Sequence, residues 1–371
     1  MNSTKAIYHW FRKVAKAFPS LTKPESRVLA LFSFGLARAQ RCTLTKVAEQ
    51  LESAGKVDTV ERRLQRFLDN PKIDWQLGCQ NLAGWVLSHL VFAGRTLVLL
   101  VDETALGEHL KVMAVSLAYR GRAIPLAWWC YPQDQYPMKQ VKLIDTLLGW
   151  VAPHVRPGYE VLVQADRGLG TSPGLLQRIR ERGWHFLVRV QGTVRVIPEG
   201  RRKSVPFRSL VQRPGQQWSG WVKAFKKAGW RRCWAIAYWG QGYQGPWLLL
   251  SDWELVQGPA YGWRMWEELA FRDFKSYGWN WQKSHVWDPA HANRLWLVMA
   301  LAYAWILSLG TQAAHLLAVR RDVCRGQCLR QSLFTLGARV LQRARELHKQ
   351  LFCLFDFIFI PYGEPTQKTV V

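Results

Sequence analysis

Apolar residues recur at helical spacing through the first hundred positions. Residues 27–40 place Val28, Leu31, Phe32 and Leu36 three or four positions apart, which predicts an amphipathic helix. A second helix is predicted to open around Thr43 and to end before Gly55. The N-terminal part of the chain is therefore expected to be helical.

A third helix is predicted after Gly55. Asp58 and Glu61 have the spacing of a capping box, and basic residues share the following helix with apolar positions. Two short helices around a Gly-containing turn, the second basic, are typical of a helix-turn-helix. A plain helical bundle with solvated arginines fits the same pattern. The residues that would contact DNA in the first case are Arg62, Arg63 and Arg66.

The pattern changes to apolar, β-branched runs after Arg95. Such runs usually mark strands that are buried on both faces. Arg120-Gly121-Arg122 is a hairpin turn between two of them. The predicted order is three strands, helix, strand, helix and strand, over residues 96–101, 111–119, 123–129, 141–151, 160–165, 175–182 and 185–190. This order predicts an α/β fold.

The rest of the chain divides into a β-rich segment and a helical one. The alternation of strands and helices is interrupted over residues 191–250 by Gly, Pro, basic residues and six Trp. Short β-like runs, such as 233–239, lie within this segment. Helical periodicity returns at residues 261–276 and again at 332–351, and the last ten residues are polar.

We therefore expect five segments. They are a helical N-terminal DNA-binding domain, the first part of a catalytic domain, a β-rich insertion subdomain, the second part of the catalytic domain and a helical C-terminal region. Their expected bounds are 1–92, 93–190, 191–252, 253–320 and 321–371.

Residues 295–319 carry no Asp, Glu, Lys or Arg and are long enough to span a bilayer. Ser308, Thr311, Gln312 and His315 recur at spacings of three and four, so they share one helix face. A buried helix with one polar stripe fits this pattern better than a membrane span.

The sequence also predicts a cytoplasmic protein. The first twenty residues lack the uninterrupted apolar stretch of a secretory signal. The seven Cys residues include no CxxC pair, which is typical of reduced thiols. Cys324 and Cys328 lie four residues apart, and metal ligation by this pair is the alternative.

The amino-acid composition predicts a polyanionic binding partner. The chain has 51 Lys and Arg against 26 Asp and Glu, a net charge of +25. Nucleic acid is the first candidate for so basic a protein and an anionic membrane surface the second. The 21 Trp favour nucleic acid, since indole rings stack on unpaired bases, although most of them are expected in the core.

Two aspartates each directly follow an apolar run: Asp102 follows residues 96–101 and Asp166 follows residues 160–165. Strand ends at the rim of a sheet are where α/β folds place active groups, and carboxylate oxygens are the ligands that Mg²⁺ prefers. A pair of metal ions held there would suit phosphodiester cleavage. Strand-terminal Asp residues are also common turn formers.

A third acid lies on the predicted helix 261–276. Tyr261, Arg264, Glu268 and Lys275 fall within an arc of about 60° on that helix. This face presents a carboxylate flanked by two cations and a phenol; a solvated, salt-bridged face is the alternative. Glu103 and Glu267, next to two of the acids, are expected to point away from them.

The spacing Tyr261-x2-Arg264-x3-Glu268-x6-Lys275 resembles the Tyr-Arg-Glu-Lys signature of bacterial insertion-sequence transposases of family four. The resemblance covers most of the chain and implies an RNase H-like catalytic domain with a β-rich insertion. It implies that Asp102, Asp166 and Glu268 form an Asp-Asp-Glu triad. The triad would ligate two Mg²⁺ ions, for which Mn²⁺ can substitute.

The resemblance also implies DNA contacts. Tyr261, Arg264, Lys275 and Arg189 would contact transposon-end DNA, and Trp247 would stack on an extruded base while the end forms a hairpin. The partners would be double-stranded DNA at the terminal inverted repeats, target DNA and a second copy of the chain. A metal-dependent nuclease or resolvase without strand transfer, and a non-catalytic DNA-binding derivative, are the alternatives.

Overall fold

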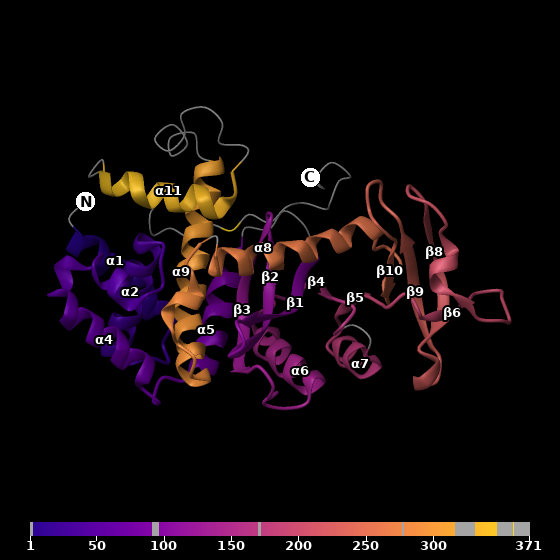
Figure 1. The fold of residues 1–371 in the computed structure, drawn as a ribbon, viewed down its shortest axis with the longest axis horizontal. Coiled ribbons are helices and arrows are strands. Elements are labelled where there is room, and N and C mark those ends of the chain that lie inside the picture. Colours follow the sequence, from indigo (N-terminus) through magenta and orange to yellow (C-terminus); the bar gives the residue numbers. More distant parts are fainter. Residues whose placement is uncertain are drawn as a thin grey trace.

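The computed structural model describes residues 3–90, 96–169, 172–276, 278–315, 331–346 and 359. Three parts follow one another along the long axis of the molecule (Figure 1). N-terminal helices lie at one end, a sheet covered by helices lies in the middle, and the strands β6 to β10 lie at the other end. Cys324, Cys328 and the last ten residues fall outside the described ranges.

The N-terminal part is helical, as expected. Thr22 and Glu25 form a reciprocal capping box at the start of α2. The capping box predicted at Asp58 is wrong: α4 begins at Val57, so Asp58 already lies in the first turn of that helix. The elements are α1 (Ser3–Ala17), α2 (Lys23–Ala39), α3 (Leu44–Ala48), a 3₁₀ turn (Glu52–Ala54), α4 (Val57–Asp69) and α5 (Trp75–Ser88).

The predicted order of three strands, helix, strand, helix and strand is confirmed. β1 pairs antiparallel with β2 and parallel with β4, β2 pairs antiparallel with β3, and β4 pairs parallel with β5. The elements are β1 (Thr96–Leu106), β2 (Leu110–Tyr119), β3 (Arg122–Pro132), α6 (Gln140–Val151), a 3₁₀ turn (Ala152–His154), β4 (Glu160–Ala165), α7 (Pro173–Glu181) and β5 (His185–Arg189).

The first strand is longer than expected. The apolar run stops at Val101, but β1 continues to Leu106 because its antiparallel partner β2 pairs with it as far as Leu106↔Leu110. Asp102 therefore lies inside β1. The parallel pairing with β4, by contrast, ends at Val101↔Ala165, so Asp102 leaves the parallel ladder where the sequence predicted it would.

The β-rich segment extends the same sheet. Its last strand, β10, pairs antiparallel with β5, and the strand order is β3-β2-β1-β4-β5-β10-β9-β8-β6-β7. The expected insertion is thus joined to strands β1 to β5 by backbone hydrogen bonds. Its elements are β6 (Arg195–Pro198), β7 (Val205–Pro206), a 3₁₀ turn (Phe207–Leu210), β8 (Gln217–Ala224), a 3₁₀ turn (Lys226–Ala228), β9 (Arg231–Tyr238) and β10 (Trp247–Ser251).

The single helix predicted over residues 261–276 is wrong. Tyr261 and Arg264 lie on a 3₁₀ helix (Gly258–Arg264), which packs the Tyr261 ring into the core, and only α8 (Met265–Phe274) is α-helical. Lys275 has a non-helical backbone, because the amides of Trp279 and Asn280 bond back to the carbonyls of Asp273 and Lys275. The four residues therefore do not form one helical stripe.

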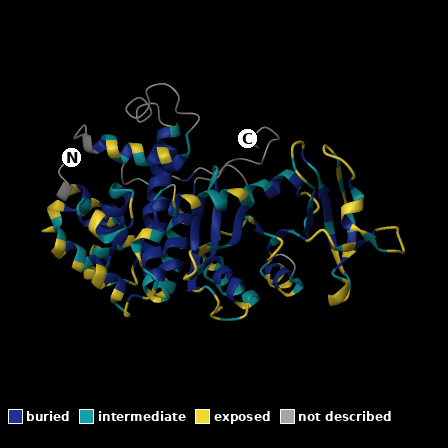
Figure 2. Ribbon diagram, in the orientation of Figure 1, coloured by how far each residue is buried: buried dark blue, intermediate teal, exposed yellow. Residues whose placement is uncertain are grey.

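A buried helix, α9 (Pro289–His315), stands between the N-terminal helices and the sheet (Figure 1). Figure 2 shows that it is buried almost throughout its length. It is long and apolar enough to cross a membrane, but 94% of its most apolar window is buried inside the protein. Three residues of the predicted polar stripe, Ser308, Thr311 and Gln312, are buried too, whereas His315 at the end of the helix is exposed. Thr311 hydrogen-bonds to the hydroxyl of Tyr119. Residues 316–319 lie outside the described ranges.

Side chains at the start of α9 connect it to both of its neighbours. The Asn293 amide bonds to the N–H and the C=O of Cys130, which satisfies backbone groups of the edge strand β3. The neighbouring Arg294 is buried and donates to the carbonyl of Leu68 at 2.6 Å, near the end of α4. These polar contacts hold the N-terminal helices against the sheet.

The C-terminal helix α11 (Leu333–Glu346) crosses α9 at two glycines. A Cβ at Gly310 would clash with the backbone oxygen of Leu333, and a Cβ at Gly337 would clash with that of Ile306. Both obstacles are backbone atoms, so the helices can approach this closely only with glycine at the crossing.

We expect Gly310→Ala to destabilise the protein by about 1–3 kcal/mol, because the added methyl group overpacks the crossing. Thermal unfolding followed by circular dichroism measures this. Gly149→Ala is the matched control, since a Cβ there meets only Arg182 Nη2, at 3.7 Å. The control should gain up to about 1 kcal/mol from helix propensity. A Gly310→Ala protein that melts no lower than wild type contradicts the close crossing.

Candidate active site

The parallel register brings the two aspartates together. Asp102 and Asp166 each follow the last paired residue of neighbouring parallel strands, Val101 on β1 and Ala165 on β4. Adjacent strands lie about 4.8 Å apart, so the two carboxyl groups leave the sheet side by side. Residues 64 positions apart in the chain thus meet because two apolar runs pair in parallel.

Arg264 joins the third acid to this pair. Its Nη2 lies 3.0 Å from Asp102 Oδ2 and 3.9 Å from Asp166 Oδ2, and its Nη1 lies 2.6 Å from Glu268 Oε1. One guanidinium therefore contacts all three predicted acids. We call Asp102, Asp166, Glu268 and Arg264 the acidic cluster.

The acidic cluster has a buried side and an open side. Asp102 is 7% exposed, whereas the side chains of Asp166 and Glu268 are 34% and 44% exposed. Asp166 is held in place because its Oδ1 accepts the backbone N–H groups of Gly168 and Leu169. A ligand can thus reach the cluster from the side of Asp166 and Glu268.

Burial controls the electrostatics of this site. Desolvation raises the pKa of Asp102 to about 6, the charge of Arg264 opposes this rise, and the two neighbouring acids add to it. Burial lowers the pKa of Arg264, but Asp102, Tyr261 and Glu268 outweigh this effect and raise the pKa above its ordinary value. The cluster is therefore a set of mutually repelling carboxylates that needs a cation to hold it together.

The donor chemistry of the cluster fits a hard divalent cation. Three carboxylates, on β1, directly after β4 and on α8, contact one guanidinium, and Mg²⁺ takes such oxygen ligands together with water. Among the described residues, no three His, Cys, Asp or Glu side chains are arranged to hold a metal ion. In the acidic cluster, the guanidinium of Arg264 occupies the space between the carboxylates.

The neighbouring glutamates point elsewhere, as expected. Glu103 lies on the other face of β1, where it accepts hydrogen bonds from Tyr131 and Tyr136 and pairs with Lys111 at 2.8 Å. Glu267 is fully buried on the inner face of α8, and its Oε1 accepts the hydroxyl of Ser116 at 2.7 Å.

The residues expected to contact DNA lie around the acidic cluster at different depths. Tyr261 is 4% exposed, its hydroxyl lies 3.4 Å from the carbonyl oxygen of Ala165, and its ring packs edge-on against Trp247. Trp247 is half-buried against Tyr238 and Tyr243 as well. Arg189 ends β5 and is partly exposed. Arg264, expected on an open face, lies inside the cluster.

Lys275 and the N-terminal arginines lie outside the acidic cluster. Lys275 Nζ donates to Thr104 Oγ1 at 2.6 Å, on the strand that carries Asp102. Arg62 and Arg66 are exposed on α4 and Arg63 is partly exposed, while the apolar side of α4 is buried. Figure 1 shows α4 at the end of the molecule opposite to β6 and β8.

Sequence reasoning missed the part played by Glu267. Burial raises the pKa of its carboxyl to about 8, so it is protonated at neutral pH, and its Oε2 has no hydrogen-bond partner. The position of Glu267 one residue before Glu268 predicts that it points into the protein. How completely it is buried depends on the packing of α8 over Ser116.

We expect Glu267→Gln to stabilise the protein increasingly as the pH rises from 5 to 8. The folded pKa of about 8 lies above the ordinary value of 4.5, so the wild type must keep a proton that its unfolded chain releases. Its stability therefore falls with pH in this window, and Gln removes that loss. Thermal melts over the pH range test this against Glu52→Gln, an exposed control. A pH-independent difference between wild type and Glu267→Gln contradicts it.

Comparison with known proteins places the chain in a family. The family model of the transposase DDE domain matches residues 107–305, more than half of the chain. The match includes Asp166 and Glu268 and begins five residues after Asp102. No curated protein matches the chain. With three acidic side chains around one cation in a mixed α/β domain, this chain belongs to the family of transposases with a DDE domain.

Proposed function

We propose that this protein is a cut-and-paste DNA transposase of insertion-sequence family four, with an RNase H-like catalytic domain. The observation that carries the proposal is the convergence of Asp102, Asp166 and Glu268 on one cation. The matched family and a net charge of +25 support DNA as the substrate. The strand order β3-β2-β1-β4-β5, antiparallel and then parallel, supports the fold assignment.

Asp102, Asp166 and Glu268 would hold the catalytic metal ions. Two Mg²⁺ ions, or Mn²⁺ in their place, would stabilise charge on the attacking and leaving oxygens of a phosphodiester. The protein supplies the carboxylates and fixes their directions through the β1–β4 register and the hydrogen bonds to Asp166. Water cuts the transposon end, and the freed 3′-hydroxyl attacks the opposite strand or the target.

Arg264 has two roles in this proposal. In the absence of DNA its guanidinium neutralises the three acids. A phosphate of the transposon end is a second anion, and it competes with the carboxylates for the fork-shaped guanidinium of Arg264. When Arg264 turns to that phosphate, the carboxylates become available to metal ions, so end binding and metal binding favour each other.

Arg189, Tyr261, Lys275 and Trp247 complete the end-binding surface in this proposal. Arg189 and Lys275 contribute positive charge on either side of the acidic cluster. The Tyr261 ring supports Trp247, with ring centroids 5.3 Å apart. Trp247 stacks on the base that leaves the duplex when a hairpin end forms.

The N-terminal helices and a second copy of the chain complete the proposed complex. The basic side of α4 bears Arg62, Arg63 and Arg66, and these residues contact the terminal inverted repeat. Two copies of the chain each bind one end of the element. The chain acts in the cytoplasm on nucleoid DNA.

The carboxylates predict the outcome of substitution. Asp102→Asn, Asp166→Asn and Glu268→Gln should each reduce end cleavage at least about 10³-fold, since a lost metal ligand removes several kcal/mol of transition-state stabilisation. The substrate is a plasmid carrying the gene with its flanking DNA, and the products are cut ends and ends joined to a target plasmid. Glu103→Gln, which changes the carboxylate on the opposite face of β1, is the matched control and should stay active.

Three results would contradict the function. Cleavage without any joining of 3′-hydroxyl ends to the target identifies a nuclease or resolvase. Binding without cleavage in the wild type identifies a DNA-binding derivative. Full activity in Asp102→Asn removes Asp102 from the reaction.

Arg264→Ala should lower the melting temperature of the metal-free protein, because three repelling carboxylates lose their counter-charge. The same variant should gain more in melting temperature from Mg²⁺ than the wild type does, since nothing competes for the ligands. Thermal melts with and without Mg²⁺ measure both effects. Arg272→Ala, an exposed position on the same helix, controls for net charge. Equal Mg²⁺ shifts in Arg264→Ala and wild type refute the proposed competition.

A further inference from the structure

The strands farthest from the N-terminal helices carry dense positive charge. Residues 191–250 include eleven Lys and Arg and a single acidic residue, Glu199. The acidic cluster uses none of these cations. Charge of this density at one end of a protein attracts a polyanion.

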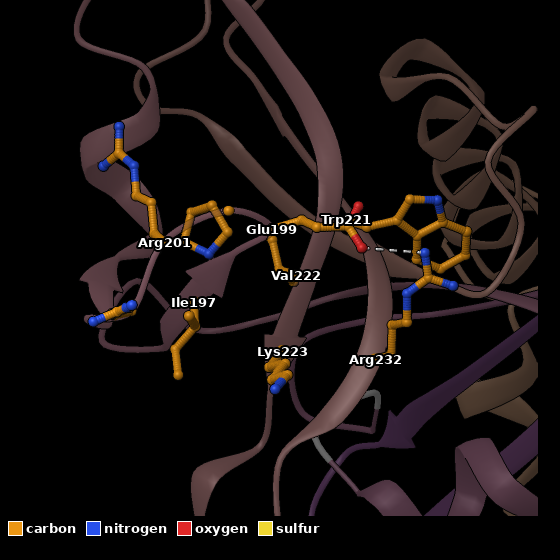
Figure 3. A pocket seen from close by; sticks show the side chains of 10 residues that line it. Ile197, Glu199, Arg201, Trp221, Val222, Lys223 and Arg232 are labelled. Carbon is orange, nitrogen blue, oxygen red and sulfur yellow. Dashed lines mark hydrogen bonds and ion pairs between the residues drawn. The ribbon is translucent and has the colours of Figure 1, made fainter.

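Four of these cations gather at one pocket of about 450 Å³ between β6, β8 and β9 (Figure 3). In this view Arg201 lies across the pocket from Trp221 and Arg232, with Lys223 between them. Arg202 also lines the pocket, and all four cationic residues are exposed. Glu199 is the one acidic residue in the lining, so the pocket has an excess of three positive charges.

Arg232 is held in place by an aromatic ring. Its guanidinium carbon lies 4.0 Å from the centroid of Trp221, and that ring is fixed in turn by an edge-on contact with Trp234. Glu199 lies 3.5 Å from Arg232, but both side chains are more than 60% exposed, so water screens their attraction. Stacking on Trp221 orients the guanidinium, and a phosphate can displace the exposed Glu199 carboxylate from Arg232 Nη2.

The side chains that line the pocket are suited to bind the phosphate backbone of duplex DNA. Arginine forks and a lysine match phosphodiester oxygens, and such contacts position a protein on DNA without reading bases. The one aromatic ring in the lining lies under Arg232, so it is not open to stack on an unpaired base. This favours double-stranded over single-stranded nucleic acid.

The strand order sets the distance to the reaction centre. Four strand spacings separate β4, which Asp166 directly follows, from β8, which carries Lys223. At about 4.8 Å for each spacing the separation across the strands is about 19 Å, which is the length of about six base pairs, at 3.4 Å per base pair, of a duplex that lies across the strands. We infer that Arg201, Arg202, Lys223 and Arg232 bind the phosphate backbone of duplex DNA about six base pairs from the cleaved bond. This rests on the proposed function and adds a second contact with the same DNA.

The test is the salt dependence of DNA binding by Arg201→Ala/Arg202→Ala. Each phosphate contact contributes about 0.9 to the slope of log affinity against log salt, so the slope should fall by about 1.8. The probe is a fluorescent 30-bp duplex of mixed sequence, titrated by anisotropy between about 50 and 200 mM KCl. Lys223→Ala alone should lower the slope by about 0.9.

Lys139→Ala/Lys142→Ala is the matched control, because it removes two exposed charges at the start of α6. Its slope should equal that of the wild type. An unchanged slope in Arg201→Ala/Arg202→Ala, or an equal fall in the control, overturns the inference. A larger loss on the single-stranded 30-mer than on the duplex overturns the duplex assignment.

The position is tested on end DNA that the wild type cleaves. Ethylation of the phosphates about six base pairs from the cut should weaken binding by the wild type and not by Arg201→Ala/Arg202→Ala. Interference only at the cut itself contradicts the inferred distance. If the wild type binds duplex with the predicted salt dependence but cuts no DNA, the pocket stands and the proposed transposase activity fails.

Discussion

The repulsion among three carboxylates is the constraint around which the centre of this protein is built. Asp102, Asp166 and Glu268 come from β1, β4 and α8, and a single guanidinium offsets their charge. Burial alone would keep Asp102 protonated to higher pH than usual, and Arg264 opposes this effect. The cluster is stable only with a cation inside it, and a site that requires a cation is well suited to exchange one cation for another.

The rest of the fold fixes the directions of these side chains. Parallel pairing of β1 with β4 sets two of them, and α8 is held over the sheet by buried polar contacts. One is the bond between Ser116 and Glu267; another is Asp273, which accepts from Arg122 at 2.6 Å and from Tyr303 at 2.8 Å. Helix α9 packs between the sheet and the N-terminal helices and joins them. The same sheet continues through β10 into the basic strands, so the acidic cluster and the basic pocket lie on one continuous sheet.

Periodicity predicted most of the elements because it depends on local burial. The run ending at Ala165 gave the observed bounds of β4, and the helix at residues 141–151 differs from α6 by one residue. Periodicity failed where tertiary contacts decide the backbone. Asp102 lies inside β1 because β2 extends the pairing, and Tyr261 lies on a 3₁₀ helix because its ring is buried beside Trp247. The position of Arg264 between the acids depends on three elements at once, so helical angles could not predict it.

We expect the three carboxylates to bind divalent metal ions at the place that Arg264 now occupies. Anomalous diffraction from crystals of the DNA-bound protein grown with Mn²⁺ tests this directly. We expect anomalous density between Asp102, Asp166 and Glu268, with the Arg264 guanidinium moved to a DNA phosphate. A structure at saturating Mn²⁺ in which Arg264 still lies between the acids, with no anomalous density there, would contradict this expectation.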